Sequence, residues 1–242
     1  MQFSIEYYDS VGSTQDLAFA KALEGVDEGY VVQAGQQEAG RGRQGNTWIS
    51  PSGNVYMSIV LRPSCSLENI GQSAFVLACA LGAALECFIE EGFGDVSLKW
   101  PNDVYISGLK NAGILLENNI NEGNVDFLIA GLGVNVKQAP EQGIAVQECT
   151  KIDLEGNAVR DKILEKTKLY YGIWQDKGFA PIRKSWLKRA HGLDQPITAR
   201  TGTREVSGIF KGIDEEGALI LDQNGALSSI TATEVFFDVL SN

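Results

Sequence analysis

Hydrophobic and polar positions along this chain change their spacing several times, and each change predicts a new element. Alternation over residues 3–8 predicts a first strand, and helical spacing of apolar residues over about 67–90 predicts the longest helix. Apolar runs bounded by turn residues predict further strands at 30–34, 55–61, 96–100, 104–106, 112–116 and 125–136. Two more helices are expected at 157–176 and 181–190.

A short second element is predicted from its start signal. The segment Ser13-Thr14-Gln15-Asp16 places a serine three residues ahead of an acidic residue, which is the pattern of a capping box. We therefore expect a helix that begins here and runs to about Leu23.

From Pro196 onward the pattern changes to short strands joined by tight turns. Strands are expected at 196–200, 205–211, 218–221 and 234–239, separated by Gly202, by 214–217 and by Asn224-Gly225. About fifty residues of this kind are typical of a small β-barrel. The chain as a whole therefore predicts an α+β fold, with a mixed sheet and packed helices over 1–190 and a small barrel over 191–242.

Composition limits the classes of protein to consider. The chain has 242 residues, of which 44% are hydrophobic and 21% charged, as in a folded protein with one sizeable core and a small accessory domain. No run approaches the 18 or so apolar residues of a membrane span, and the first six residues lack the basic and apolar regions of a signal peptide. We expect a cytoplasmic protein that does not bind membranes.

Charge and metal-ligating residues exclude further classes. The four cysteines form no CxxC pair and there is one histidine, so a zinc site, a disulfide framework and a Cys-His nucleophile are not expected. The net charge of -11 argues against broad nucleic-acid binding, which depends on lysine and arginine neutralising phosphates. We expect no DNA partner and no metal held by the protein alone.

The run Gly40-Arg41-Gly42-Arg43-Gln44-Gly45 is the most informative local feature. It carries two arginines, and no acidic residue occurs between Gly40 and Ser50, so we expect these guanidinium groups to be unpaired within the loop. Glycines bring backbone N–H groups close to a ligand, and arginine donors suit phosphate. Taken alone, the run is also compatible with a flexible RNA-binding segment or an ordinary surface turn.

Three other segments add chemistry of the same kind. The run 99–103, Lys-Trp-Pro-Asn-Asp, presents a lysine, an asparagine and an aspartate at a predicted strand end. The run 110–117 places a lysine just ahead of a glycine and an apolar strand, and 131–135 contains two glycines that would let a flat ligand approach the backbone. Each alone has an ordinary interpretation, as a turn, a solvent-facing lysine or tight sheet packing.

Taken together and in this order, the four segments resemble the biotin–protein ligases, of the monofunctional type without an N-terminal DNA-binding domain. The resemblance implies an enzyme that uses ATP to convert biotin to biotinyl-5'-AMP. It then implies transfer of biotin to a lysine of the biotin carboxyl carrier protein of acetyl-CoA carboxylase. The implied fold is a catalytic domain shared with lipoyl ligases and octanoyl transferases, followed by an SH3-like barrel. ATP and biotin would be substrates, with Mg²⁺ carrying pyrophosphate charge.

The resemblance also implies roles for individual residues. The catalytic group would be Lys110, Arg41 and Arg43. Biotin would be bound by Ser13, Thr14, Gln15, Gln37, Gly40, Gly113 and Gly131. The nucleotide would be bound by Arg43, Trp48, Lys99, Asn102, Asp103 and Asn135.

The chain departs from the family pattern at several positions. Gln15 stands where asparagine is frequent, and Gln44 and Asn46 stand where arginine is frequent. The last predicted strand begins Thr233-Glu234-Val235 instead of Gly-Glu-Val. Two alternatives stay open: a lipoate or octanoate ligase of the same fold, and a non-catalytic protein that binds biotin. A homodimer through the catalytic sheet is implied by resemblance only.

Overall fold

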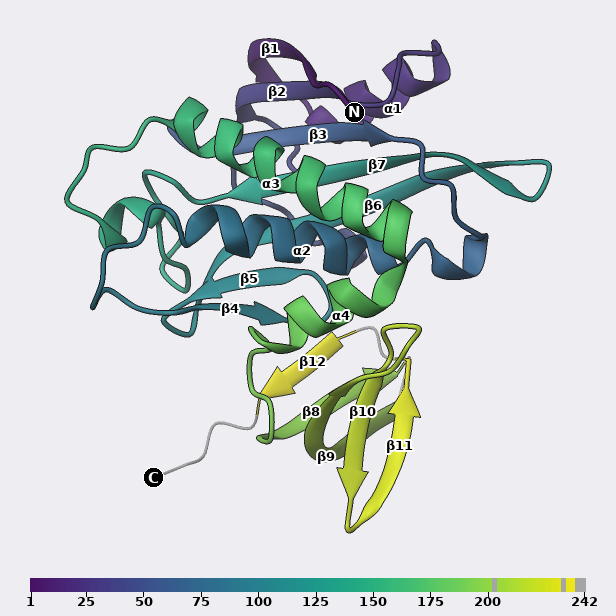
Figure 1. Ribbon diagram of the computed structural model, residues 1–242. Coiled ribbons are helices and arrows are strands. Elements are labelled where there is room, and N and C mark those ends of the chain that lie inside the picture. Colours follow the sequence, from purple (N-terminus) through teal and green to yellow (C-terminus); the bar gives the residue numbers. More distant parts are fainter. Residues whose placement is uncertain (202–203, 232–233, 238–242) are drawn as a thin grey trace.

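A seven-stranded mixed sheet forms the centre of the molecule in the computed structural model, which describes residues 1–201, 204–231 and 234–237 (Figure 1). Its strands are β1 (Ser4–Val11), β2 (Tyr30–Gln37), β3 (Val55–Leu61), β4 (Val96–Lys99), β5 (Asp103–Ile106), β6 (Leu109–Asn121) and β7 (Asn124–Val134). Their spatial order is β1-β2-β3-β7-β6-β5-β4. Only β1 and β2 pair in parallel, because α1 (Thr14–Leu23) crosses between them, and the other pairs are antiparallel.

Helices cover both faces of this sheet. The helices α2 (Gln72–Leu85) and α3 (Gly156–Lys177) lie across one face, with α4 (Phe179–Leu187) beside them (Figure 1). On the other face, α1 presents small side chains, Ala18 and Ala22, to Val32, Val60 and Phe127. Small residues let this helix approach the sheet closely, and the space beside it holds the pocket described below.

A second, antiparallel sheet follows α4. Its strands are β8 (Pro196–Thr201), β9 (Arg204–Ile213), β10 (Leu219–Gln223), β11 (Ala226–Ile230) and β12 (Glu234–Phe237), in the order β11-β10-β9-β8-β12. The expected α+β class is confirmed, and this small sheet is consistent with the SH3-like domain that the resemblance implied. The expected boundary at 190/191 falls between α4 and β8 and stays a prediction.

One strand of this second sheet was not predicted. Residues 226–230 alternate poorly in polarity, yet they pair with β10 as β11. The two-residue turn Asn224-Gly225 closes this hairpin, with φ of 57° and 89° that suit asparagine and glycine. Three expected features lie outside the described residues: the turn at Gly202, Thr233 at the start of the last expected strand, and residues 238–239 at the end of that strand.

The longest predicted helix is shorter than its apolar spacing indicated. Instead of 67–90, α2 runs from Gln72 to Leu85, preceded by a separate 3₁₀ turn at Leu67–Asn69. At its end, the amides of Cys87 and Phe88 bond three residues back, to Ala84 and Leu85. This tightening turns the chain away from the helix axis, so the apolar residues beyond Leu85 pack as a turn.

The same stretch corrects the expectation that no segment is apolar enough for a membrane span. Residues Leu67–Leu85 have that length and composition, with a mean hydropathy of 1.2, but 67% of the stretch is buried inside the protein. The stretch packs against α3, α4 and the strands β4, β5 and β6 as part of the main core. Burial of this kind is what a core helix requires.

Candidate active site

A cavity of about 210 Å³ lies between α1, the 40–48 loop and the sheet strands β3, β7 and β6. It brings together most of the residues that the sequence indicated. Those that line it are Ser13, Thr14, Gln15, Gln37, Arg41, Arg43, Trp48, Lys99, Asn102, Asp103, Lys110, Gly113 and Gly131.

Two expected site residues lie elsewhere. Gly40 lines a neighbouring cavity beneath the loop, and a Cβ there would lie 2.4 Å from the carbonyl oxygen of Trp48, so only glycine fits. Asn135 lines neither cavity: it is 3% exposed, and its carbonyl oxygen accepts from Asn111 Nδ2 at 2.8 Å. Its role in nucleotide binding stays a prediction without a pocket contact.

One end of the pocket, called the neutral end below, carries a network of uncharged polar side chains, beside which Arg41 is neutralised by two carboxylates. Thr14 Oγ1 lies 2.9 Å from Ser58 Oγ, and Ser58 Oγ donates to Gln15 Oε1 at 3.0 Å. Gln37 Oε1 accepts from both the amide and the hydroxyl of Thr14, at 2.9 and 3.1 Å. A buried network of this kind is suited to a neutral ligand head with both donors and acceptors.

This network replaces the expected capping box. Ser13 is the N-cap of α1, but its side chain makes no capping hydrogen bond. The first helical amide, that of Thr14, donates to Gln37 across the pocket, and the Asp16 carboxylate binds Arg41. The local pattern was correct for a helix start and wrong for its capping partners, because tertiary partners compete for the same groups.

Glycines form the floor of the pocket. Gly113 and Gly133 face each other on β6 and β7, and Gly131 pairs with Ser58 of β3. A Cβ on Gly131 would lie 2.4 Å from Gln15 Oε1. The absence of that Cβ is what lets the longer Gln15, in the place of the family's frequent asparagine, lie over the strand.

Trp48 covers the other part of this floor. A Cβ on Gly133 would lie 2.5 Å from the indole ring, and one on Gly113 would lie 3.0 Å from it. The indole nitrogen is buried, and no acceptor for it is found among the described residues. The sequence analysis expected a flat ligand to approach these glycines, but in the structure the indole ring of Trp48 lies against them.

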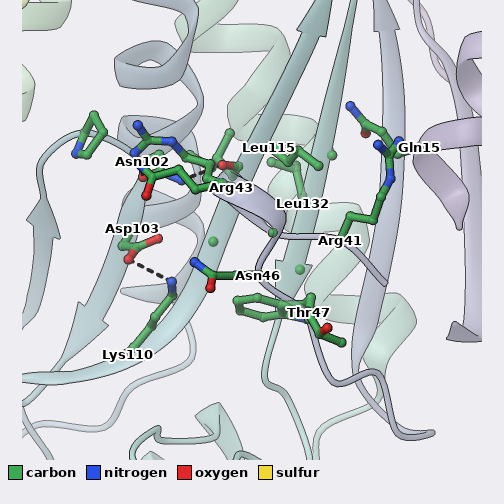
Figure 2. A pocket seen from close by; sticks show the side chains of 18 of the residues that line it. Gln15, Arg41, Arg43, Asn46, Thr47, Asn102, Asp103, Lys110, Leu115 and Leu132 are labelled. Atoms are coloured by element: carbon green, nitrogen blue, oxygen red, sulfur yellow. Dashed lines mark hydrogen bonds and ion pairs between the residues drawn. The ribbon is translucent and has the colours of Figure 1, made fainter. Parts of the chain in front are cut away.

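The opposite end of the pocket is charged. Lys110 Nζ lies 2.7 Å from Asp103 Oδ2 and 5.5 Å from the centre of the Trp48 ring. Arg43 Nη1 donates to Asn102 Oδ1 at 2.8 Å. Figure 2 shows Asp103, Lys110 and Asn102 on one side of the pocket, and Gln15 with Arg41 on the other.

Lys99 completes this charged end from the side. Its Nζ donates to the hydroxyl of Tyr105 at 3.3 Å, and the Tyr105 ring stacks on His191 with centroids 5.0 Å apart. Burial, together with the charge of Asp103, raises the pKa of Tyr105 to about 12, so the phenol stays protonated. Burial and the nearby Lys99 lower the pKa of His191, so this ring does not add a competing positive charge at neutral pH.

Arg41 is not the unpaired cation that the sequence indicated. Its guanidinium binds both oxygens of Glu117, at 2.9 and 3.1 Å, and Asp16 Oδ1 at 2.5 Å. These carboxylates come from β6 and α1, so no local reading of the loop could have found them. Arg41 therefore ties the loop to the sheet at the neutral end, while Arg43 points to the charged end.

Most of the other lining residues belong to the segments that the sequence analysis singled out, but Ser58 and Val235 do not. Ser58 links the neutral network, and its only signal was a polar residue inside the apolar strand 55–61. Val235 of β12 is 3% exposed and reaches the pocket from the second sheet. No spacing in the sequence relates Val235 to the other lining residues.

The lining suits a reaction between two bound substrates. Among the described residues, no cysteine or histidine lines the pocket, so it offers no Cys-His or Ser-His nucleophile. It offers a neutral hydrogen-bonding end, a narrow glycine floor and a cationic end. Cations at one end can bring two anionic groups together.

Comparison with known proteins agrees with this geometry. Residues 7–135 match the biotin/lipoate A/B protein ligase family, and residues 192–238 match the biotin protein ligase C-terminal domain. The biotin–[acetyl-CoA-carboxylase] ligase of Paracoccus denitrificans is 40% identical over 226 residues, which cover 90% of this chain and 94% of that protein. The bifunctional ligase/repressor BirA of Bacillus subtilis is 35% identical, over 95% of this chain and 72% of its own length.

A solved structure is similar over nearly the whole chain. The biotin protein ligase of Aquifex aeolicus, in complex with biotin and ATP, superposes with a TM-score of 0.82 at 27% identity. The match covers 97% of this chain and 99% of that one. On the matched family regions and on its similarity to these relatives, this chain belongs to the biotin protein ligase family.

Proposed function

We propose that this protein is a biotin–[biotin carboxyl carrier protein] ligase, which makes biotinyl-5'-AMP from biotin and ATP and transfers biotin to a carrier lysine. The observation that supports this most is the division of one pocket into a neutral network and a cationic end. The neutral network of Thr14, Gln15 and Gln37 matches an uncharged ureido ring. The cationic end matches a carboxylate and a triphosphate.

In the first half-reaction, a carboxylate oxygen of biotin bonds to the α-phosphorus of ATP and pyrophosphate leaves. The two reactants are both anionic, so their approach needs positive charge between them. Lys110 is held for this by Asp103, and Arg43 can exchange its contact with Asn102 for a phosphate oxygen. Lys99 adds a third cation at the same end.

Mg²⁺ fits this end as an ion that arrives with ATP. Among the described residues, no group of three or more acidic, histidine or cysteine side chains could hold a metal. Mg²⁺ needs only one or two carboxylates besides phosphate oxygens and water, and among the described lining residues Asp103, which also pairs with Lys110, is the one carboxylate. When bound, the ion would neutralise charge on the leaving pyrophosphate.

In the second half-reaction, the amine of the carrier lysine attacks the acyl carbon of the adenylate and AMP leaves. The adenylate must be kept from water until then. We assign this to the 40–48 loop, which lines the pocket and is closed as a hairpin by Gly42 N to Asn46 O at 2.7 Å and Trp48 N to Gly40 O at 2.9 Å. Arg41 anchors it at one end of the pocket and Arg43 at the other.

The partners follow from this activity and from the family. The carrier would be the biotin carboxyl carrier protein of acetyl-CoA carboxylase. The protein would meet this substrate in the cytoplasm. We also propose that the described chain binds neither DNA nor membranes. A homodimer through the catalytic sheet is proposed on the resemblance to the family alone.

Acyl specificity provides the first test. The protein, incubated with Mg-ATP and biotin, lipoate or octanoate in turn, should accumulate biotinyl-AMP, identified by mass spectrometry. Lipoyl-AMP or octanoyl-AMP in its absence would assign the chain to the other activity of the fold. No adenylate with any acid, together with measurable biotin affinity, would indicate a binding protein.

A further inference from the structure

Trp100 connects the charged end of the pocket to the second sheet. It lines the pocket, is 8% exposed, and stands between Lys99 and the pair Asn102 and Asp103. Its indole Nε1 donates to the carbonyl oxygen of Gly217 at 2.9 Å, in a buried hydrogen bond that spans 117 positions of sequence. Gly217 belongs to the turn 214–217 between β9 and β10.

This turn is held firmly within its own sheet. The Asp214 carboxylate accepts hydrogen bonds from the amides of Glu216 and Ala218, at 3.1 and 2.8 Å. The amide of Asp214 also donates to the carbonyl oxygen of Ala218 at 2.9 Å. A turn closed by three such bonds offers Trp100 an acceptor in a fixed position.

The helices of the catalytic part also bind this turn and the residue just before it. Gln72 Nε2 donates to the carbonyl oxygen of Glu215 at 3.4 Å, and Arg183 Nε donates to that of Ile213 at 2.6 Å. Phe75 lies directly on Gly217: a Cβ there would come within 2.6 Å of the ring, and φ is 91°. Only glycine fits this contact.

We propose that the hydrogen bond from Trp100 to Gly217 makes Trp100 a positioning residue for the charged end of the pocket. The 214–217 turn acts as a fixed support behind the Lys99–Asp103 segment and sets where Lys99, Asn102 and Asp103 lie. The second sheet thereby influences the KM for ATP through Trp100, which acts without having to touch the nucleotide. The neutral end depends on α1, β2 and β3 and is independent of this support. The inference rests on the proposed ligase activity.

The test is Trp100→Phe, which keeps a buried ring and removes the donor. The matched control is Trp186→Phe: Trp186 is fully buried against Phe75 and Phe210, and its Nε1 has no acceptor among the described residues. Both substitutions replace a buried indole with a smaller ring near the second sheet, but only Trp100→Phe removes a hydrogen bond. All assays run well below the lower of the two melting temperatures.

In biotin-dependent pyrophosphate exchange, Trp100→Phe should raise KM for ATP about fivefold or more, as expected for one lost buried hydrogen bond. The Kd for biotin should change less than about twofold, and Trp186→Phe should leave both constants near the wild-type values. An unchanged KM for ATP in Trp100→Phe, or an equal rise in the control, would overturn the inference. A wild-type protein that makes no biotinyl-AMP would instead count against the ligase activity itself.

A second variant covers the case in which Trp100→Phe does not fold. Gly217→Ala displaces the turn from the Phe75 side and alters no pocket-lining residue. It should raise KM for ATP in the same way, again with the biotin Kd within about twofold. Equal losses for ATP and biotin would show a general structural effect and contradict the positioning role.

Discussion

Replacing Lys110 by alanine should slow biotin-dependent pyrophosphate exchange by at least about a hundredfold, the usual effect of removing one oriented donor from developing charge. Lys110 is ion-paired to Asp103 and lies beside Trp48, at the place where carboxylate and phosphate would meet. Without its charge, the Asp103 carboxylate would also face the two anionic reactants unpaired. The loss should therefore appear in kcat rather than in biotin affinity alone.

A matched lysine separates this effect from loss of an ordinary ion pair. Lys137 pairs with Asp153, has a side chain 29% exposed compared with 37% for Lys110, and does not line the pocket. Lys137→Ala should keep exchange within about threefold of the wild type, because exposed ion pairs contribute little. If Lys110→Ala stays equally close to the wild type, Lys110 has no part in adenylation.

Replacing Arg43 by glycine should release the adenylate before transfer. Arg43 reaches from the loop to Asn102 at the charged end, and a phosphate oxygen in that place would receive a charge-assisted hydrogen bond. Removing such a bond costs about 1.5–3 kcal/mol, so the residence time of biotinyl-AMP should fall about tenfold or more. Released adenylate should then biotinylate lysines of an added bystander protein, measured by streptavidin blotting.

The control for this second prediction adds a glycine without removing a charge. Ile49 follows the loop, is 69% exposed and does not line the pocket. Ile49→Gly should leave labelling confined to the carrier. Confined labelling in Arg43→Gly as well would show that the loop retains the adenylate by other contacts.

The Gly-Arg loop shows what the sequence could and could not predict. Its glycines and arginines suggested an anion-binding loop but, taken alone, left a flexible segment or a surface turn open. Only together with the segments at 99 and 110 did the loop predict one site, and residues of all three line the pocket. The pairing of Arg41 could not be predicted, since Glu117 is 76 positions away and Asp16 had been interpreted as part of a capping box. Local patterns carry information on elements, whereas partners depend on packing.

The same distinction holds for the fold. Strand and helix positions in the catalytic part follow from apolar spacing, because burial on a sheet or against a helix imposes that spacing. The end of α2 at Leu85 and the pairing of β11 with β10 depend on contacts with other parts of the chain, which the spacing of apolar residues does not reveal. Val235 likewise reaches the pocket from the second sheet, whose contacts with the catalytic part, such as Trp100 Nε1 to the Gly217 carbonyl oxygen, appear in no local pattern.

The central claim is the complete transfer reaction, and the mass of the carrier tests it most directly. The protein should be incubated with Mg-ATP, biotin and a biotin carboxyl carrier domain, beside a carrier variant in which arginine replaces the acceptor lysine. Intact mass spectrometry should show one biotinyl group on the carrier and none on the variant. An unmodified carrier, in a reaction where biotin and ATP are both bound, would contradict the assignment.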